Sequence, residues 1–474
     1  EELLTLWKES TTNLLKAYNF SDEEIADLLE KRLELDRRIA AVVLSNEESS
    51  EYAKLYHPYA YEDFKKFAPA LPLDDFFQAV LGQVPDKVIV DEERFWQAAE
   101  QFYSEEAWPL LKATLILGVV NLSTSYLTDE IRVLSGAYGR ALSGVPEAQD
   151  KVKAAYHLAQ GPFKQALGLW YAHEKFSPEA KTDVEKKVAT MIDVYKERLA
   201  NNDWLTPETR DKAIVKLNVI KPYIGYPEEL PERYKDKVVD ETASLFENAL
   251  AFARVEIKHS WSKWNQPVDY KEWGMPAHMV NAYYNPQKNL IVFPAAILQA
   301  PFYDLHQSSS ANYGGIGAVI AHEISHAFDT NGASFDENGS LKDWWTENDY
   351  AAFKEKTQKV IDQFDGQESY GARINGKLTV SENVADLGGI AAALEAAKRE
   401  PDFSAEEFFH NFARIWRMKG RPELMKLMAS VDVHAPAKLR VNIQVPNFDD
   451  FFTTYDVKEG DGMWRSPEDR VIIW

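Results

Sequence analysis

Residues 319–329 read VIAHEISHAFD, and within them His322, Glu323 and His326 form the pattern His-Glu-x-x-His. Positions four apart lie on the same face of an α-helix, so both imidazoles can bind one ion. Neutral imidazole suits Zn²⁺, and the intervening glutamate can accept a proton from a water that the ion activates. The stretch therefore predicts a helix over residues 317–328 that holds a catalytic zinc. The alternative is a chance match on a buried helix.

A second stretch offers the third protein ligand that a catalytic zinc needs. Residues 381–389 read SENVADLGG and place Glu382 and Asp386 four apart at the start of a predicted helix. Glu382 can complete a His₂Glu site. Asp386 can accept a hydrogen bond from a ligating histidine and fix its tautomer, and Asp329 can do the same for the other ring. The alternative is that the two carboxylates only complement the positive end of a helix dipole.

Two cationic side chains near the end of the chain can face a developing oxyanion. Asp432, His434 and Arg440 lie within nine residues of one another in the sequence DVHAPAKLR. Both cations can stabilise negative charge that forms on a carbonyl oxygen, and Asp432 can orient the imidazole. A lone Asp-x-His is usually structural, so this prediction depends on the rest of the site.

A short β-prone pair offers a place for an extended substrate. Residues 280–284 and 290–293 are separated by the turn-like NPQKN, which predicts a hairpin with Asn281 and Ala282 on an edge strand. An exposed edge can pair with a peptide backbone, and the Asn281 amide both donates and accepts hydrogen bonds. The alternative is a plain hairpin without a binding role.

The composition excludes several classes of function. The chain has 474 residues, no cysteine and a net charge of −22. Disulfides, thiolate metal sites and a cysteine nucleophile are therefore excluded, and the acidic balance argues against nucleic acid as a partner. The most apolar window, residues 110–120, is too short to span a membrane and contains Lys112, so we expect no membrane segment and no signal peptide.

Helices dominate the expected organisation, with a small sheet in the second half. Ser21 and Glu24 form a capping box that predicts a helix start, and Pro178 and Pro207 mark two more. The stretch 224–234 contains two prolines and reads as a connection between lobes.

Taken together, the motifs resemble a known family. The matching segments are VNAYY at 280–284, IVFPA at 291–295, NYGGIG at 312–317, HEISHAFD at 322–329, ENVADLGG at 382–389 and DVH at 432–434, followed by Arg440. Their order and content resemble the neprilysin family of zinc endopeptidases, peptidase family M13, and most closely its bacterial oligopeptidase O members. The matches cover essentially all of the second half of the chain, with softer ones in the first half, such as GAYGR at 136–140.

The resemblance implies a mainly α fold, in which two predominantly helical lobes enclose a central cavity. Residues 1–225 would be the helical lobe that covers the site. Residues 226–474 would be the catalytic lobe, thermolysin-like (gluzincin) with a small β-sheet. The family cleaves peptides of limited length, often before a large apolar residue, because a closed cavity screens out folded proteins.

The resemblance also implies a role for each site residue. The zinc ligands would be His322, His326 and Glu382, and Glu323 would be the general base. His434 and Arg440 would contact the oxyanion and the substrate backbone, and Asp386 would orient a ligating histidine. Asn281 and Ala282 would hold the peptide main chain. The apolar pocket for the residue after the scissile bond would be lined by Ile297, Phe302, Ala318, Val319, Ile415 and Trp416.

The chain departs from the family pattern in two respects. It has no cysteine, whereas animal members on the cell surface carry disulfides, which fits a bacterial enzyme. We expect a cytoplasmic location rather than a secreted or cell-surface one, although the cysteine usage does not decide it. It also starts well inside the pattern, with about 150 residues missing upstream for a typical member. We therefore expect it to associate with a missing N-terminal segment or a second chain that covers apolar surface.

Two other functions remain open at this point. One is a peptide- or host-protein-binding module built on an incomplete, inactive peptidase scaffold. The other is a zinc hydrolase that acts on amides other than peptides. Intact Glu323 and a full ligand set argue against the first, and the predicted edge strand at Asn281 favours peptides over the second.

Overall fold

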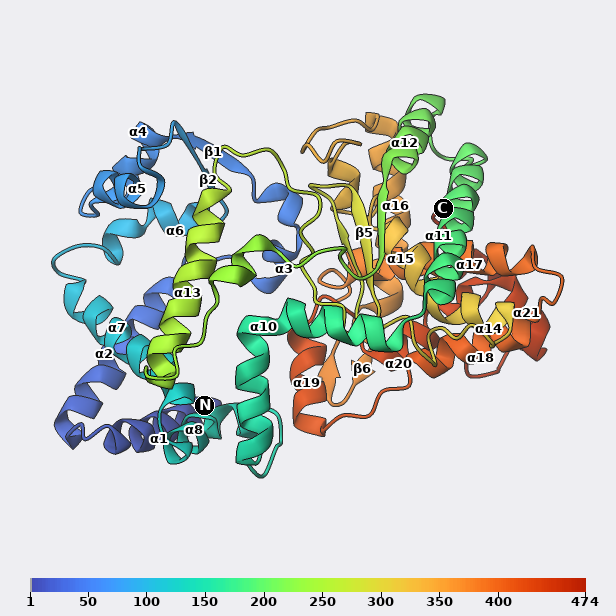
Figure 1. Ribbon diagram of the computed structural model, residues 1–474. Coiled ribbons are helices and arrows are strands. Elements are labelled where there is room, and N and C mark those ends of the chain that lie inside the picture. Colours follow the sequence, from blue (N-terminus) through green and yellow to red (C-terminus); the bar gives the residue numbers. More distant parts are fainter. Residues whose placement is uncertain (1) are drawn as a thin grey trace. The chain divides into compact units, whose positions relative to one another are not determined.

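Helices dominate the structure, a computed structural model that describes residues 2–474 (Figure 1). The chain divides into two compact units. The first comprises the chain up to Phe163 together with Pro231–Val268 and Arg421–Leu424, and the second comprises Lys164–Leu230, Asp269–Gly420 and Met425–Trp474. The mainly α fold with small sheets confirms the expected fold class. The two units are defined by their internal packing. The predicted boundary at residue 225 instead separates a lobe that covers the site from a catalytic lobe, and it stays a prediction.

The first unit is built from short helices and one hairpin-like pair of strands. Its helices are α1 (Glu2–Ala17), α2 (Asp22–Ala40), α3 (Asn46–Ser50), α4 (Tyr61–Phe64), α5 (Leu73–Leu81), α6 (Glu93–Gln97), α7 (Trp108–Ser123), α8 (Asp129–Ser135), α9 (Ala137–Leu142) and α13 (Leu245–Ser262). The strands β1 (His57–Ala60) and β2 (Lys87–Val90) pair antiparallel. Helix α10 (Lys151–Lys175) begins in this unit and continues into the second, with non-helical backbone at Phe163 directly after Pro162.

Helices α2 and α7 make the most extensive helix–helix contact of the first unit. The predicted capping box is confirmed, since the Ser21 hydroxyl accepts from the Glu24 amide and the Glu24 carboxylate accepts from the Ser21 amide. Helix α7 is apolar on all sides. Its buried face packs beside α2, and its opposite face exposes four large apolar side chains, each more than half exposed: Trp108, Leu115, Val119 and Leu122.

The second unit contains the longer helices and a three-stranded sheet. Its helices are α11 (Pro178–Ala200), α12 (Pro207–Val219), α14 (Ser309–Asn312), α15 (Ala318–Ser325), α16 (Glu347–Phe364), α17 (Val380–Lys398), α18 (Ala405–Ile415), α19 (Pro422–Val431, which begins in the first unit), α20 (Ala437–Asn442) and α21 (Asp449–Tyr455). The strands are β3 (Lys221–Gly225), β4 (Tyr283–Asn285), β5 (Leu290–Pro294), β6 (Glu368–Ser369) and β7 (Ala372–Arg373). The helix starts predicted at Pro178 and Pro207 are confirmed.

Strand β5 lies at the centre of the three-stranded sheet and is buried along its whole length. It pairs parallel with β3 and antiparallel with β4. The prediction that Asn281 and Ala282 belong to the edge strand is wrong, because β4 begins only at Tyr283. The register that opposes Tyr283 to Val292 would oppose Asn281 to Pro294, which has no N–H to donate. The two residues therefore continue the edge without ladder bonds.

Helices α15 and α17 make the most extensive helix–helix contact in the second unit. Every residue of α15 is buried. On α17, a Cβ at Gly389 would lie 2.9 Å from both the Ala318 carbonyl oxygen and the His322 amide nitrogen. A side chain at Gly388 would meet the Ser325 hydroxyl at 2.4 Å. The two glycines thus allow the backbones to approach until side chains on either helix can share one ion.

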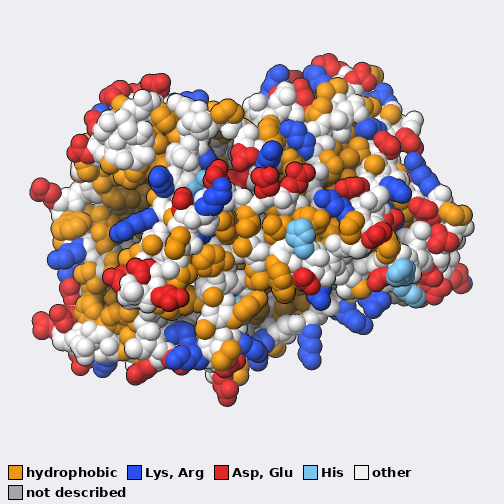
Figure 2. Space-filling model, in the orientation of Figure 1, with side chains coloured by type: hydrophobic (Ala, Val, Ile, Leu, Met, Phe, Trp, Pro, Cys, Tyr) orange, Lys and Arg blue, Asp and Glu red, His pale blue; other side chains and the backbone are white. Residues whose placement is uncertain are grey.

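On the face of the molecule drawn in Figure 2, acidic and basic side chains are interspersed rather than gathered into a field of one sign. In the part of the chain that the structure describes, no helix combines the length and the apolar character needed to cross a bilayer.

We expect Gly389→Ala to lower the free energy of unfolding by about 1–3 kcal/mol, because the new methyl group forces α15 and α17 apart. Gly118→Ala is the matched control. It replaces a glycine inside helix α7 whose Cβ would meet nothing within 4 Å, and it should stabilise by about 0.5–1 kcal/mol. Chemical denaturation followed by circular dichroism measures both, and equal stabilisation by the two changes would contradict the close approach.

Candidate metal centre

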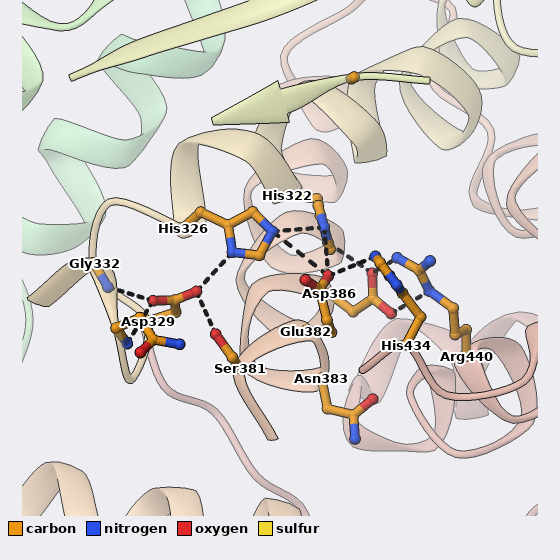
Figure 3. A network of polar contacts seen from close by, with 12 residues as sticks. His322, His326, Asp329, Gly332, Ser381, Glu382, Asn383, Asp386, His434 and Arg440 are labelled. Atoms are coloured by element: carbon orange, nitrogen blue, oxygen red, sulfur yellow. Dashed lines mark hydrogen bonds and ion pairs between the residues drawn. The ribbon is translucent and has the colours of Figure 1, made fainter. Parts of the chain in front are cut away.

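Two imidazoles and one carboxylate converge between α15 and α17 (Figure 3). His322 lies in the last turn of α15, His326 directly follows the helix, and Glu382 lies in the first turn of α17. The Glu382 Oε2 atom is 3.2 Å from His322 Nε2 and 3.5 Å from His326 Nε2. The two Nε2 atoms are 3.0 Å apart. One ligand atom from each residue therefore lies within reach of a single ion, as the sequence predicts.

The hydrogen bonds of the Nδ1 atoms determine which nitrogen of each histidine ring can bind a metal. His322 Nδ1 lies 2.9 Å from Asp386 Oδ1, and His326 Nδ1 lies 2.6 Å from Asp329 Oδ2. Because ionised carboxylates only accept hydrogen bonds, both Nδ1 atoms carry a proton, and each Nε2 atom faces inward, where it presents a lone pair whenever it is deprotonated. None of the described residues gives Glu382 Oε2 a hydrogen bond of good geometry, although the atom is buried. Three lone pairs converge on one point, which is the arrangement a divalent cation requires.

Buried charge determines the protonation of these ligands. Burial alone would raise the pKa of Glu382, but the imidazoles, His326 foremost, hold it well below its usual value. Burial alone would lower the pKa of His326, but Glu382 and Asp329 together raise it well above 6.5. In the metal-free chain the carboxylate is therefore ionised and the imidazole protonated at neutral pH, so a bound metal must displace a proton.

Asp386 lies at the centre of a buried ion pair. Arg440 donates from Nε to Asp386 Oδ2 at 2.8 Å and from Nη2 to Oδ1 at 2.7 Å. Burial raises the pKa of Asp386, but Arg440 and His322 lower it more, to about 2. The Arg440 guanidinium also lies 3.7 Å from the Trp416 ring centroid. Within the described chain its Nη1 has no hydrogen bond, so that nitrogen remains able to bind a substrate oxygen.

His434 faces the same cluster from the loop after α19. Its Nδ1 lies 2.8 Å from Asp432 Oδ1, and its Nε2 lies 3.2 Å from Glu382 Oε2. Burial lowers the pKa of His434, but Asp432 and Glu382 raise it to about 9. The imidazole is therefore cationic at neutral pH, and its side chain is 46% exposed, which leaves it accessible to a ligand.

Glu323 differs from the other carboxylates of the site. It is buried on α15 beside His322, and burial, the largest influence, raises its pKa. None of the described residues donates a hydrogen bond to it or pairs with it ionically. A carboxylate that is desolvated and unpaired next to a metal site is well placed to accept a proton.

Asp329 is held by more groups than the sequence revealed. Its Oδ2 accepts from His326 and from the Ser381 hydroxyl at 2.6 Å, and its Oδ1 accepts from the Asn331 and Gly332 amides at 2.8 and 2.6 Å. Sequence reasoning missed Ser381, although its place directly before Glu382 was a usable signal. Asp329 thus fixes the His326 ring from a rigid loop.

The residues predicted to bind substrate fall into two groups. Ile297 and Val319 are buried in the core of the second unit, and Phe302 and Trp416 pack against that core half-buried. Ala282 is buried, whereas Asn281 is exposed and its side-chain oxygen accepts from the Ala282 amide at 2.9 Å. Their roles in substrate binding stay predictions.

Comparison with known sequences identifies the family. Models of peptidase family M13 match residues 1–227 and 281–471. The chain belongs to peptidase family M13. This confirms the resemblance, and it makes the His-Glu-x-x-His helix a family feature rather than a chance match.

Individual M13 relatives extend the match over the whole chain. A Streptococcus gordonii protein named as a zinc metalloproteinase is 75% identical over 86% of this chain and 72% of its own length. The neutral endopeptidase of Lactococcus lactis is 47% identical over all of this chain and 75% of its own. Among solved structures, PepO from Lactobacillus rhamnosis superposes with a TM-score of 0.96 at 36% identity, covering 100% of this chain and 75% of that one.

We expect the zinc affinity of this M13 chain to weaken as the pH falls. The pKa of each ligating histidine is raised in the metal-free chain, so protons compete with the metal below that pKa. Each displaced proton reduces the apparent affinity about tenfold per pH unit. Chelator competition between pH 5 and 8 measures the slope. An affinity independent of pH over that range would contradict the protonation states described above.

Proposed function

We propose that this chain is the catalytic part of a zinc-dependent endopeptidase that hydrolyses short peptides on the amino side of hydrophobic residues. The observation that supports the proposal most directly is the convergence of His322, His326 and Glu382 beside a buried, unpaired Glu323. The names of the relatives support the same class, since they include neutral endopeptidases and a zinc metalloproteinase. No observation on the site favours an inactive scaffold.

Zinc fits the residues that converge. The donor set is two imidazole nitrogens and one carboxylate oxygen, which leaves a position for water or substrate and is typical of catalytic zinc. When bound, zinc supplies a Lewis acid that polarises a carbonyl and lowers the pKa of water. His322, His326 and Glu382 would hold it, oriented by Asp386 and Asp329.

Glu323 would act as the general base. Its raised pKa brings proton acceptance closer to neutral pH than for an exposed glutamate. It would take a proton from the attacking water and later deliver it to the leaving amine nitrogen. That transfer is balanced, because the peptide bond breaks with one proton moved from water to nitrogen.

His434 and Arg440 would stabilise the oxygen of the scissile carbonyl as negative charge develops on it. His434 is cationic below about pH 9 and partly exposed, and Arg440 retains a free Nη1. Preorganised cations of this kind contribute to the transition state rather than to ground-state binding.

The substrate would lie along the segment before β4. Asn281 and Ala282 extend the sheet edge without ladder bonds, so their backbone groups, apart from the Ala282 amide that donates to Asn281 Oδ1, can pair with an extended peptide. Ile297, Phe302, Val319 and Trp416 would receive the apolar side chain after the scissile bond, because they already belong to one apolar cluster. The expected cytoplasmic location in a bacterium stays a prediction.

We also propose that an N-terminal segment, carried by the same protein or by a second chain, covers the exposed face of α7. The full-length matches span about three quarters of the relatives, so about a quarter of each relative has no counterpart here. The exposed face of α7 carries a stripe of four large apolar side chains, with Lys112 among them, of the kind that proteins usually cover.

Val119→Asp should reduce co-purification of such a segment with this chain at least tenfold, because it places a charge in the middle of that stripe. Val215→Asp, at a 46% exposed valine on α12, is the matched control and should have no effect. Equal co-purification of wild type and Val119→Asp would contradict the proposal.

Metal analysis of the purified protein, with cleavage of a short apolar peptide before and after chelation, tests the proposed activity. Glu323→Gln should retain zinc and lose at least about 10²–10⁴-fold in kcat, because the amide cannot accept the proton. Lys212→Met, at an exposed lysine outside the site, should leave both the zinc content and kcat unchanged. A zinc-loaded Glu323→Gln that cleaves at the wild-type rate would refute the assignment of the base.

A further inference from the structure

A lysine lies fully buried on the apolar face of helix α12. Lys216 is 1% exposed and shares that face with the buried Ala213, Leu217 and Ile220. Within the described chain no carboxylate lies within ion-pair distance of its ammonium. Burial of an unpaired charge is costly, so the surroundings must satisfy it in another way. Nothing in the proposed mechanism uses this residue.

Three backbone carbonyls satisfy the ammonium. Lys216 Nζ donates to the carbonyl oxygens of Ala327 at 2.8 Å, Gly332 at 2.8 Å and Phe335 at 2.6 Å. An ammonium has three N–H donors, so each has one acceptor. All three acceptors belong to residues 327–335, the loop that directly follows His326. We call this segment the Asp329 loop.

Aromatic rings close the space around the ammonium. The rings of Phe328, Trp344 and Tyr284 lie 5.7–6.0 Å from Nζ. Burial lowers the pKa of Lys216 to about 7, and the charge of Asp329 opposes that decrease. The directional contacts of this side chain are its three hydrogen bonds to the Asp329 loop.

The Asp329 loop is held at both backbone groups of Gly332. The Gly332 amide donates to Asp329 Oδ1 at 2.6 Å, while the Gly332 carbonyl accepts from Lys216. Asp329 in turn accepts from His326 Nδ1 at 2.6 Å. A displacement of the loop by a few tenths of an ångström would thus be transmitted to the ring that points at the metal position.

The backbone of Lys216 also connects to the hairpin beside the proposed substrate position. Its carbonyl accepts from the Asn289 amide side chain at 3.1 Å, and the same amide donates to the Glu337 carbonyl at 3.2 Å. The Tyr284 hydroxyl donates to Asn289 Oδ1 at 3.1 Å. Lys216 therefore lies where α12, the Asp329 loop and the β4–β5 hairpin meet.

We propose that Lys216 is a positioning residue of the metal centre, which fixes the Asp329 loop so that Asp329 orients His326. This inference rests on the proposed function only in that the centre binds zinc. Lys216 touches neither ligand nor substrate and acts through three carbonyls and one carboxylate.

The test is a double-mutant cycle on zinc affinity, measured by chelator competition. Lys216→Met keeps the length and removes the donors, and Asp329→Asn removes the charge that orients His326. Lys212→Met is the matched control, since it makes the same substitution one turn earlier on α12 at a lysine paired with Glu208 on the surface. Thermal unfolding of the metal-free variants and the visible spectrum of bound Co²⁺ report folding and ligand geometry separately.

We expect Lys216→Met to weaken zinc binding about 10–100-fold and to change the Co²⁺ spectrum, while Lys212→Met stays within about twofold of wild type. In the Asp329→Asn background, Lys216→Met should weaken zinc binding by a further factor of less than about two, because both substitutions break the same chain of contacts to His326. If Lys216→Met does not fold, Lys216→Gln takes its place in the cycle. Its amide has two N–H donors on a shorter side chain and cannot serve all three carbonyls, so it should still weaken zinc binding, by less than Lys216→Met.

Unchanged zinc affinity in a folded Lys216 variant would overturn the proposal. A loss that adds in full to that of Asp329→Asn would also overturn it, since it would indicate a general structural role. These outcomes differ from failure of the proposed function, in which the wild-type protein itself would bind no zinc or cleave no peptide.

Discussion

The close approach of α15 to α17 is the constraint on which the rest of the structure depends. Gly388 and Gly389 bring the α17 backbone against α15, so that Glu382 on one helix lies near His322 and His326 from the other. On α11, the Tyr195 hydroxyl donates to the Ala321 carbonyl and contacts the Ser325 hydroxyl, which holds α15 to α11 beside Gly388 of α17. A site assembled from helices is more precise than one assembled from loops, and here two of three ligands lie on helices.

Charge in this buried region alternates in sign along each chain of contacts. Arg440 neutralises Asp386, Asp386 orients His322, and the ring faces Glu382. On the other side Lys216 holds the loop of Asp329, which orients His326. Removing one member leaves its neighbour buried and unpaired, which costs more than the pair contributes when intact. A bound metal would complete this alternation of charge, because it is the cation toward which the imidazoles and Glu382 direct their lone pairs.

Much of the site could be predicted because its spacing follows the helix period. His322 and His326, and likewise Glu382 and Asp386, lie four apart and therefore share a face wherever the helices pack. Asp329 was placed by the same reasoning. Lys216, Tyr195 and Ser381 could not be found in this way, since their contacts depend on how α12, α11 and α17 pack against α15. The sequence shows a lysine among apolar positions on α12. The reason, three hydrogen bonds from its ammonium to backbone carbonyls, appears only in the folded structure. The edge strand was predicted to begin three residues too early, because the lack of a donor at Pro294 matters only once the register is known.

The most direct test of this account is the zinc content of Glu382→Ala measured against wild type under identical dialysis. The account requires the α17 carboxylate as the third ligand, brought to α15 by the two glycines. It predicts one zinc per chain in the wild type, and a loss of zinc affinity of at least about 100-fold in Glu382→Ala with the helical content unchanged. Full zinc occupancy in Glu382→Ala, or none in the wild type, would contradict it.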